Sequence, residues 1–189
     1  MELLEELERY RPWNEQEERD REELLRRLKS GEALYGREPA AHLTASAWVV
    51  SPDRKQVLMA YHNLYDSWAW LGGHADGDRD LLETAMREVR EESGLTDVRP
   101  VSRSIYSLEI LTVDGHEKRG RYVSSHLHLN VTYLLEADPA APVRNRPGEN
   151  SRVAWFPLEE AVAASSEPWF RERIYQKLNA KLAGFPPGV

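Results

Sequence analysis

Three carboxylates in one short segment have the types and spacing to bind a metal ion. Glu88, Glu91 and Glu92 lie within GGHADGDRDLLETAMREVREESGL, which covers residues 72–95. Side chains three and four positions apart share one face of a helix, so these carboxylates would lie close together and repel one another. A hard divalent cation such as Mg2+ or Mn2+, which prefers oxygen ligands, would relieve that repulsion. The alternative is an ordinary solvated acidic helix face.

The residues around these carboxylates resemble the Nudix box, the signature of hydrolases that cleave a nucleoside diphosphate linked to another group. The family pattern opens with a glycine, here Gly73. Its second half is filled without a gap by Arg87, Glu88, Val89, Glu91, Glu92, Gly94 and Leu95. The first glutamate of the pattern falls instead on Arg79, which stands between Asp78 and Asp80. Either one of these aspartates takes over the supporting role of that glutamate, or the site is weakened.

The resemblance implies a role for each residue of the box. Glu88 and Glu92 are expected to be direct ligands of Mg2+ or Mn2+, and Glu91 to bind metal or activate water. A main-chain carbonyl of Gly73, or of the glycine before it, would complete the ligand shell, because glycine lets the backbone approach closely. Arg87 is expected to hold the carboxylates in place by a bidentate ion pair.

Members of this family often recruit one more carboxylate from outside the box. The candidate is Glu149, in the loop sequence PGENSRVAWF just before an aromatic strand. The alternative is an ordinary acidic loop residue. The general base of the reaction stays open between Glu91 and Glu149.

Histidines form a second group of candidates. His126, His128 and Asn130 alternate with apolar residues, so the three polar side chains share one face of a strand. His74 directly follows the glycine pair. We expect His74, His126 and His128 to contact the substrate; a transition-metal site and an ordinary polar layer of a sheet are the alternatives.

Two further groups could contact the ends of a substrate. Arg119, in a basic loop with Lys118 and Arg121, could meet a second phosphate, although charged loops are usually only solvated. A set of aromatic residues could stack a nucleobase or could belong to the core. This set comprises Tyr61, Tyr65, Trp68 and Trp70.

The elements that must position these residues can be predicted from local patterns. Asp80, followed three residues later by Glu83, predicts the start of the box helix, and Gly94 predicts its end. Strands are expected over residues 42–50, 56–62, 68–71, 104–112, 126–136 and 153–156, with polar loops at 114–120 and 139–150, and one or two helices from 158 to about 182. Strands mixed with a few helices indicate a mixed sheet covered on both faces. The resemblance implies the α/β/α sandwich of the Nudix fold.

The first 38 residues are expected to form a charged helical extension. Asn14 with Glu17 resembles a capping box, and Gly31 is a plausible helix end. The extension could pack on the main domain or on a second subunit. Residues 39–189 are then assigned to a Nudix hydrolase domain with C-terminal helices.

Composition narrows the function classes. The 189 residues carry a net charge of −7, 41% are hydrophobic and 30% charged, which fits a folded globular chain and argues against binding of duplex nucleic acid. There are no cysteines, which excludes disulfides and thiolate chemistry and agrees with a cytoplasmic location. No apolar run reaches membrane-spanning length, so no membrane partner is expected. The expected partner is a small-molecule diphosphate, and a homodimer is possible.

Three functions compete on this basis. The first is a metal-dependent hydrolase in which water attacks phosphorus in a nucleotide, nucleotide sugar or dinucleotide. The second is a nucleotide-binding or regulatory module that has lost hydrolysis, for which Arg79 is the motive. The third is an isomerase, because residues 42–76 also resemble isopentenyl-diphosphate isomerases, which share the fold. Those enzymes use a cysteine, which this chain lacks.

Overall fold

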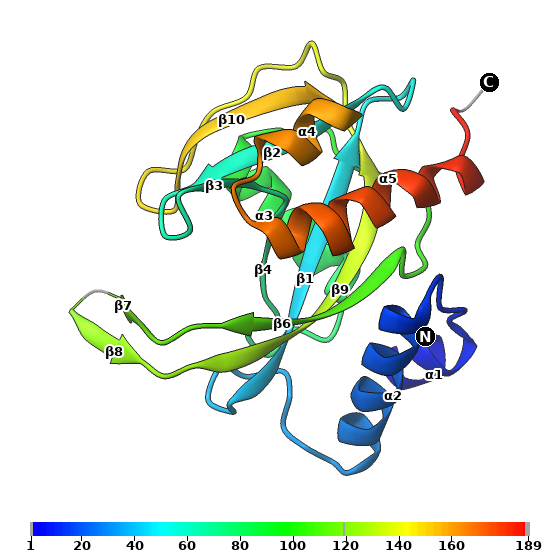
Figure 1. Ribbon diagram of the computed structural model, residues 1–189, viewed down its shortest axis with the longest axis vertical. Coiled ribbons are helices and arrows are strands. Elements are labelled where there is room, and N and C mark those ends of the chain that lie inside the picture. The colour runs from blue at the N-terminus through cyan, green and yellow to red at the C-terminus, as the bar shows by residue number, and fades with distance from the viewer. Residues whose placement is uncertain (1, 119, 188–189) are drawn as a thin grey trace.

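The computed structural model describes residues 2–118 and 120–187, and a mixed, curled β-sheet forms its centre (Figure 1). The hydrogen-bonded order is β10-β2-β1-β9-β5, with β3 on β2, β4 on β1 and β6 on β9. β1 and β9 are parallel, and the other pairs of this sheet are antiparallel. The strands are β1 (Ala41–Val50), β2 (Gln56–His62), β3 (Ser67–Ala69), β4 (Leu71–His74), β5 (Arg99–Pro100), β6 (Ser107–Val113), β9 (His126–Glu136) and β10 (Asn150–Pro157). β7 (His116–Lys118) and β8 (Arg121–Val123) form a separate hairpin that projects from the body (Figure 1).

Helices cover both faces of the sheet. They are α1 (Leu3–Arg9), α2 (Glu15–Lys29), α3 (Leu81–Ser93), α4 (Leu158–Ala164) and α5 (Gln176–Lys181), with a π-helical turn (Phe170–Tyr175) before α5 and a 3-10 turn (Leu182–Gly184) after it. Alternate residues of β1 serve the two layers. Ala45 and Val49 pack in the core that contains α3, whereas Trp48 and Val50 pack in the core that contains α4 and α5. This arrangement confirms the expected α/β fold class.

The N-terminal helices pack on the edge of the sheet formed by β6. The predicted cap is present, since Oδ1 of Asn14 accepts a hydrogen bond from the backbone N–H of Glu17 (3.0 Å). Side chains of α1 and α2 then bond to backbone groups on or next to β6. Glu6 accepts from the N–H of Ile105, Gln16 donates to the carbonyl of Leu108, and Asp20 accepts from the N–H of Ile110. These backbone groups face away from β9, so the helices satisfy donors and acceptors that the sheet leaves open.

A buried group of charges, the Glu17 cluster, joins this edge to α5. It consists of Glu17, Glu109, Lys177 and Lys181, all buried. Glu17 lies 3.2 Å from Lys177 and 2.7 Å from Lys181, and Lys177 lies 3.0 Å from Glu109. Burial alone would raise the pKa of Glu17, but the two lysines outweigh it and lower the pKa to about 2. The N-terminal helices are therefore tied to the main body by buried charge pairs.

Most of the predicted elements are present, and the differences have local causes. The strands expected at 56–62 and 126–136 are confirmed. The stretch expected as one strand at 68–71 is divided between β3 and β4, which pair with different neighbours. The loop expected at 114–120 was wrong in part, because its polar residues form β7 of the hairpin. An exposed two-stranded ribbon buries little apolar surface, so its strands lack the hydrophobic alternation by which strands are predicted.

None of the helices in the described part of the chain has the length and apolar character needed to cross a membrane.

Candidate active site

The box helix α3 is fixed at both ends by the predicted residues. Oδ1 of Asp80 accepts from the N–H of Glu83 at 3.0 Å, which caps the N-terminus. Gly94 ends the helix in the left-handed conformation (φ +75°), which glycine adopts without strain. Leu81, Leu82, Ala85 and Val89 bury the apolar face. This packing sets the rotation of α3 so that its acidic residues lie against β4.

The two glycines of β4 receive two of the carboxylates. The N–H of Gly72 donates to Oε2 of Glu92 at 3.1 Å. A Cβ added to Gly73 would lie 2.5 Å from Cδ of Glu88, a separation that no side chain could keep. Any larger residue at position 73 would therefore displace the Glu88 carboxylate, which explains the glycine at the start of the box.

Burial divides the four acidic residues into two pairs. Glu88 and Glu92 are only 9% and 7% exposed. The side chains of Glu91 and Glu149 are 39% and 45% exposed. Glu149 lies beside the box because Arg146 contacts both Glu149 and Glu91, and its carboxylate is on the open side of the site.

Two guanidinium groups bridge these acids. Nη1 of Arg87 lies 2.7 Å from Glu88 and 3.7 Å from Glu91. The expected bidentate pairing was wrong, because one nitrogen of Arg87 spans two carboxylates. Nη1 of Arg146 lies 2.7 Å from Glu91 and 3.0 Å from Glu149.

Arg146 was missed by sequence reasoning. It stands in the irregular loop between β9 and β10, where no spacing signals a contact with α3. Its position depends on Asn150, whose Oδ1 accepts from the N–H of Arg146 and whose side-chain amide donates to the carbonyl of Glu92. This bridge forms only in the folded chain, so no signal in the sequence indicated it.

The raised pKa values of the buried carboxylates indicate that the site has too few positive charges. Burial raises the pKa of Glu92 to about 8, with Glu88 and Glu149 adding to the rise. Burial also raises the pKa of Glu88, although Arg87 opposes it. When all four carboxylates of the described cluster are ionised, as a bound cation would favour, they outnumber the two guanidinium groups by two negative charges. Oxygen donors with that charge fit a divalent cation such as Mg2+ or Mn2+.

The departure from the family pattern lies at the start of α3. The guanidinium of Arg79 lies over the ring of Tyr35, 4.8 Å from its centroid. Asp80 caps α3, and Oδ1 of Asp78 accepts from the N–H of Asp80. Both neighbouring aspartates therefore hold the turn before the helix.

The predicted histidines lie together on the other face of the sheet. His74, His126 and His128 meet His42, and the four ligand nitrogens lie within 4.8 Å of one another. Burial and the neighbouring histidines lower the pKa of His128 to about 3. Asn130 shares this face, as expected, but is buried. Arg119 lies outside the described residues.

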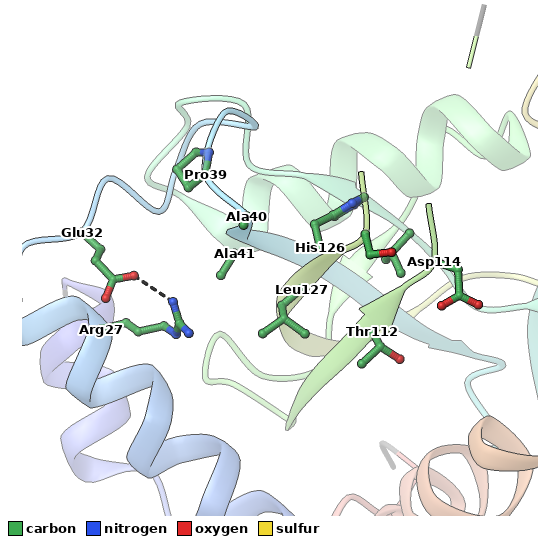
Figure 2. Close-up of a pocket in the computed structure, with 11 residues that line it drawn as sticks. Arg27, Glu32, Pro39, Ala40, Ala41, Thr112, Asp114, His126 and Leu127 are labelled. Carbon is green, nitrogen blue, oxygen red and sulfur yellow. Dashed lines mark hydrogen bonds and ion pairs between the residues drawn. The ribbon is translucent and has the colours of Figure 1, made fainter. Parts of the chain in front are cut away.

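A pocket of about 620 Å³ lies next to this histidine group (Figure 2). It opens between the end of α2, where Arg27 pairs with Glu32, and the adjoining ends of β1, β6 and β9. Of the predicted site residues in the described chain, His126 lines it, and the box carboxylates do not.

The predicted aromatic set divides between core and surface. Trp70 packs edge-on against Phe170 and Tyr175, so it belongs to the core. Tyr65 is 41% exposed and stacks on His62, with ring centroids 4.5 Å apart. The N–H of Asn63 donates to the carbonyl of Glu149, which places this exposed pair beside the acid cluster.

The chain is similar to known proteins in sequence pattern and in fold. The family model described as NUDIX domain matches residues 40–178. A C. elegans Ap4A hydrolase in a binary complex is 20% identical, with 76% of this chain and 98% of that chain covered and a TM-score of 0.51. The E. coli dihydroneopterin triphosphate pyrophosphohydrolase is 16% identical, covering 71% and 92%, with a TM-score of 0.52. A NUDIX-family hydrolase from Clostridium perfringens is 21% identical, covering 75% and 96%, with a TM-score of 0.51.

A comparison with curated proteins found no match. The structural likenesses show a shared fold. The family model spans well over half of the chain, and the protein therefore belongs to the Nudix family.

Proposed function

We propose that this protein is a divalent-metal-dependent hydrolase that cleaves a diphosphate linkage in a nucleoside diphosphate derivative. The observation that carries the proposal is the pair of buried carboxylates, Glu88 and Glu92, in a cluster where four acidic side chains meet only two guanidinium groups. Such a cluster is costly without a cation and favourable with one.

Glu88 and Glu92 would hold the ion, together with a main-chain carbonyl at Gly73. When bound, Mg2+ or Mn2+ would neutralise phosphate oxygens and lower the pKa of coordinated water. Arg87 stands between Glu88 and Glu91 and offsets their mutual repulsion. The protein thus supplies a preorganised set of oxygen ligands at the surface of β4.

The base that activates water is to be sought among the two exposed carboxylates. Glu91 contacts both Arg87 and Arg146, whereas Glu149 pairs with Arg146 at the end of a loop. A carboxylate held by fewer partners turns more readily toward a water molecule. We therefore assign Glu149 as the general base and Glu91 as a residue that positions it through their shared Arg146.

The exposed ring pair beside Glu149 suggests how a flat group is bound. His62 and Tyr65 offer a stacked aromatic surface next to the acid cluster. Stacking of a base on these rings would leave its phosphates directed toward the carboxylates. Nucleotides, nucleotide sugars and dinucleotides all fit this description.

The test is turnover of a panel of these three substrate classes with Mg2+, with Mn2+ and after chelation, in water enriched in oxygen-18. Metal-dependent cleavage, with the heavy isotope in a phosphate product, is expected. Glu92→Gln serves as the control that removes the charge and keeps the shape. Binding of nucleotides without turnover across the panel would favour the regulatory module instead, and proton exchange into an isoprenyl diphosphate would favour the isomerase.

A further inference from the structure

Four of the six histidines in the chain converge on one point of the sheet. They come from three neighbouring strands: His42 from β1, His74 from β4, and His126 and His128 from β9. Their ring centroids are about evenly spaced, with His42 lying 5.1, 5.0 and 5.2 Å from His74, His126 and His128. His128 lies 4.9 Å from His74 and 5.0 Å from His126. The four rings therefore gather around one point, with a ligand atom of each within 4.8 Å of the others.

These spacings match imidazoles around one ion. Zinc–nitrogen bonds of about 2.0–2.1 Å in a tetrahedron place the nitrogens about 3.3–3.4 Å apart. In the structure, Nε2 of His126 and Nε2 of His128 are 3.2 Å apart. All four ligand atoms already lie within 4.8 Å of one another, so small rotations of the rings would complete the tetrahedron.

Two of the rings are oriented by their outer nitrogens. Nδ1 of His42 lies 3.0 Å from the carbonyl of Pro39, and Nδ1 of His126 lies 2.8 Å from the carbonyl of Ser124. A carbonyl only accepts, so each Nδ1 carries the proton and each Nε2 is left with a lone pair. Metal-binding histidines are typically held in this way.

His42 gives an independent indication of a ligand. Its side chain is 4% exposed, and its Nε2 is buried without a hydrogen-bond partner among the described residues. Buried polar atoms in folded proteins almost always have partners. An unpaired nitrogen on a ring about 5 Å from three other imidazoles is a donor that an ion would use.

The histidine group is separate from the carboxylate cluster. His74 pairs with Thr44 and Gly73 with Ala45 across β1 and β4, so the two neighbours point to opposite faces of the sheet. The Gly73 side receives Glu88 and α3, and the His74 side holds the imidazoles. The ligand chemistry differs too, because imidazole nitrogen favours zinc-like ions and carboxylate oxygen favours Mg2+.

We propose that His42, His74, His126 and His128 bind one first-row transition-metal ion of the zinc class, in addition to the ions of the carboxylate cluster. The pocket of Figure 2, which His126 lines, gives this ion a route from solvent. Bound there, the ion would join β1, β4 and β9 and fix the strand end next to Gly73. It would thereby stabilise the glycine turn that receives Glu88.

The test uses the full chain without a histidine tag, stripped of metal and titrated with Zn2+ or Co2+ in excess Mg2+. We expect one equivalent to bind, with the strong visible absorption of tetrahedral Co2+. Loss of an outer partner of a metal ligand costs about 10- to 100-fold in affinity, so His42→Ala and His128→Ala should each lose at least about 100-fold. His62→Ala removes an imidazole outside the group and should leave affinity unchanged.

A measurement on the unaltered protein covers the case in which these variants misfold. Nitrogen-15 spectra of the histidine side chains should shift for four imidazoles on Zn2+ binding, with His62 unmoved. Zn2+ binding lost in Glu92→Gln but kept in His42→Ala would place the ion at the carboxylates and overturn the proposal. The absence of stoichiometric binding to the unaltered protein would overturn it as well, without bearing on hydrolysis at the carboxylates.

Discussion

The molecule contains two clusters of charged residues, each with two buried acids, and the surroundings of these acids differ. In the Glu17 cluster, two glutamates meet two lysines within the fold, and the pKa of Glu17 falls to about 2. In the box cluster, four glutamates meet two arginines, and the pKa of Glu92 rises to about 8. The first has equal numbers of acidic and basic side chains, whereas the second has two more acidic than basic ones, which suits the divalent ion proposed above.

The difference distinguishes an acid that holds the fold together from one that is kept for chemistry. Both Glu17 and Glu92 are buried, so burial alone does not separate them. Their partners do. A buried acid whose charge is already balanced by the protein has little affinity left for a cation. A buried acid without such partners is available to bind one.

The contrast is tested most directly by the same substitution, Glu to Gln, at Glu92 and at Glu17. Glu92→Gln should lower kcat by on the order of 10³-fold or more, because metal coordination contributes several kcal/mol to stabilising the transition state. Its free energy of unfolding without metal should change little, since a neutral side chain suits that position. Steady-state kinetics and urea unfolding measure the two quantities. Retained turnover with normal Mg2+ dependence would refute the assignment of Glu92.

Glu17→Gln should show the reverse pattern. Removing one partner leaves Lys177 and Lys181 buried with less compensation, which costs about 3–5 kcal/mol of the free energy of unfolding. The folded fraction should keep a kcat close to that of the unaltered enzyme, since Glu17 lies away from the box. A large loss of kcat with unchanged stability would contradict this division of roles.

Within the box cluster, Glu149→Gln separates the base from the metal ligands. A general base contributes about 100-fold or more to the rate, so kcat should fall by roughly that factor while the apparent affinity for Mg2+ is preserved. Glu91→Gln is the matched control and should cost less. The comparison of kcat with Mg2+ titrations decides the assignment, and an equal loss in the two variants would reject it.

The pH dependence of stability tests whether the fold stabilises the charged form of Glu17. Its folded pKa of about 2 lies below the ordinary value of 4.5, so its contribution is fully present above pH 4.5 and is lost as the pH falls toward 2. The difference in unfolding free energy between the unaltered protein and Glu17→Gln should therefore shrink over this range. Urea unfolding at a series of acidic pH values measures it; a constant difference would show that Glu17 is not selectively stabilised in its charged form.

The smallest effect is expected at Arg79. Arg79→Glu restores the family residue but removes the contact with Tyr35, which is worth about 0.5–1 kcal/mol at an exposed site. Activity should stay within about threefold, a change of under 1 kcal/mol, because Asp78 and Asp80 already order the turn. A tenfold gain in activity or Mg2+ affinity would instead identify Arg79 as the cause of a weakened site.

Local sequence signals were sufficient for the box helix and for the longest strands. Asp80 and Gly94 each interact only with the adjacent turn at their own end of α3. The alternation of residues 126–136 lies within a single strand. The contacts of Arg146 and His42 were not accessible in the same way. Arg146 depends on the course of an irregular loop, and His42 meets His128 only through the parallel pairing of β1 with β9. Such pairing joins residues far apart in the chain, and no local pattern encodes it.

The N-terminal helices also bear on the tendency of the protein to aggregate. The family match begins at residue 40, so a chain shortened to begin there would lose α1 and α2 and leave β6 with an open edge. An unpaired edge strand is a template on which other molecules add strands, and the cut would also strip Lys177 and Lys181 of Glu17. A protein shortened in this way would be expected to aggregate. The helices therefore protect the edge of the sheet from intermolecular strand pairing.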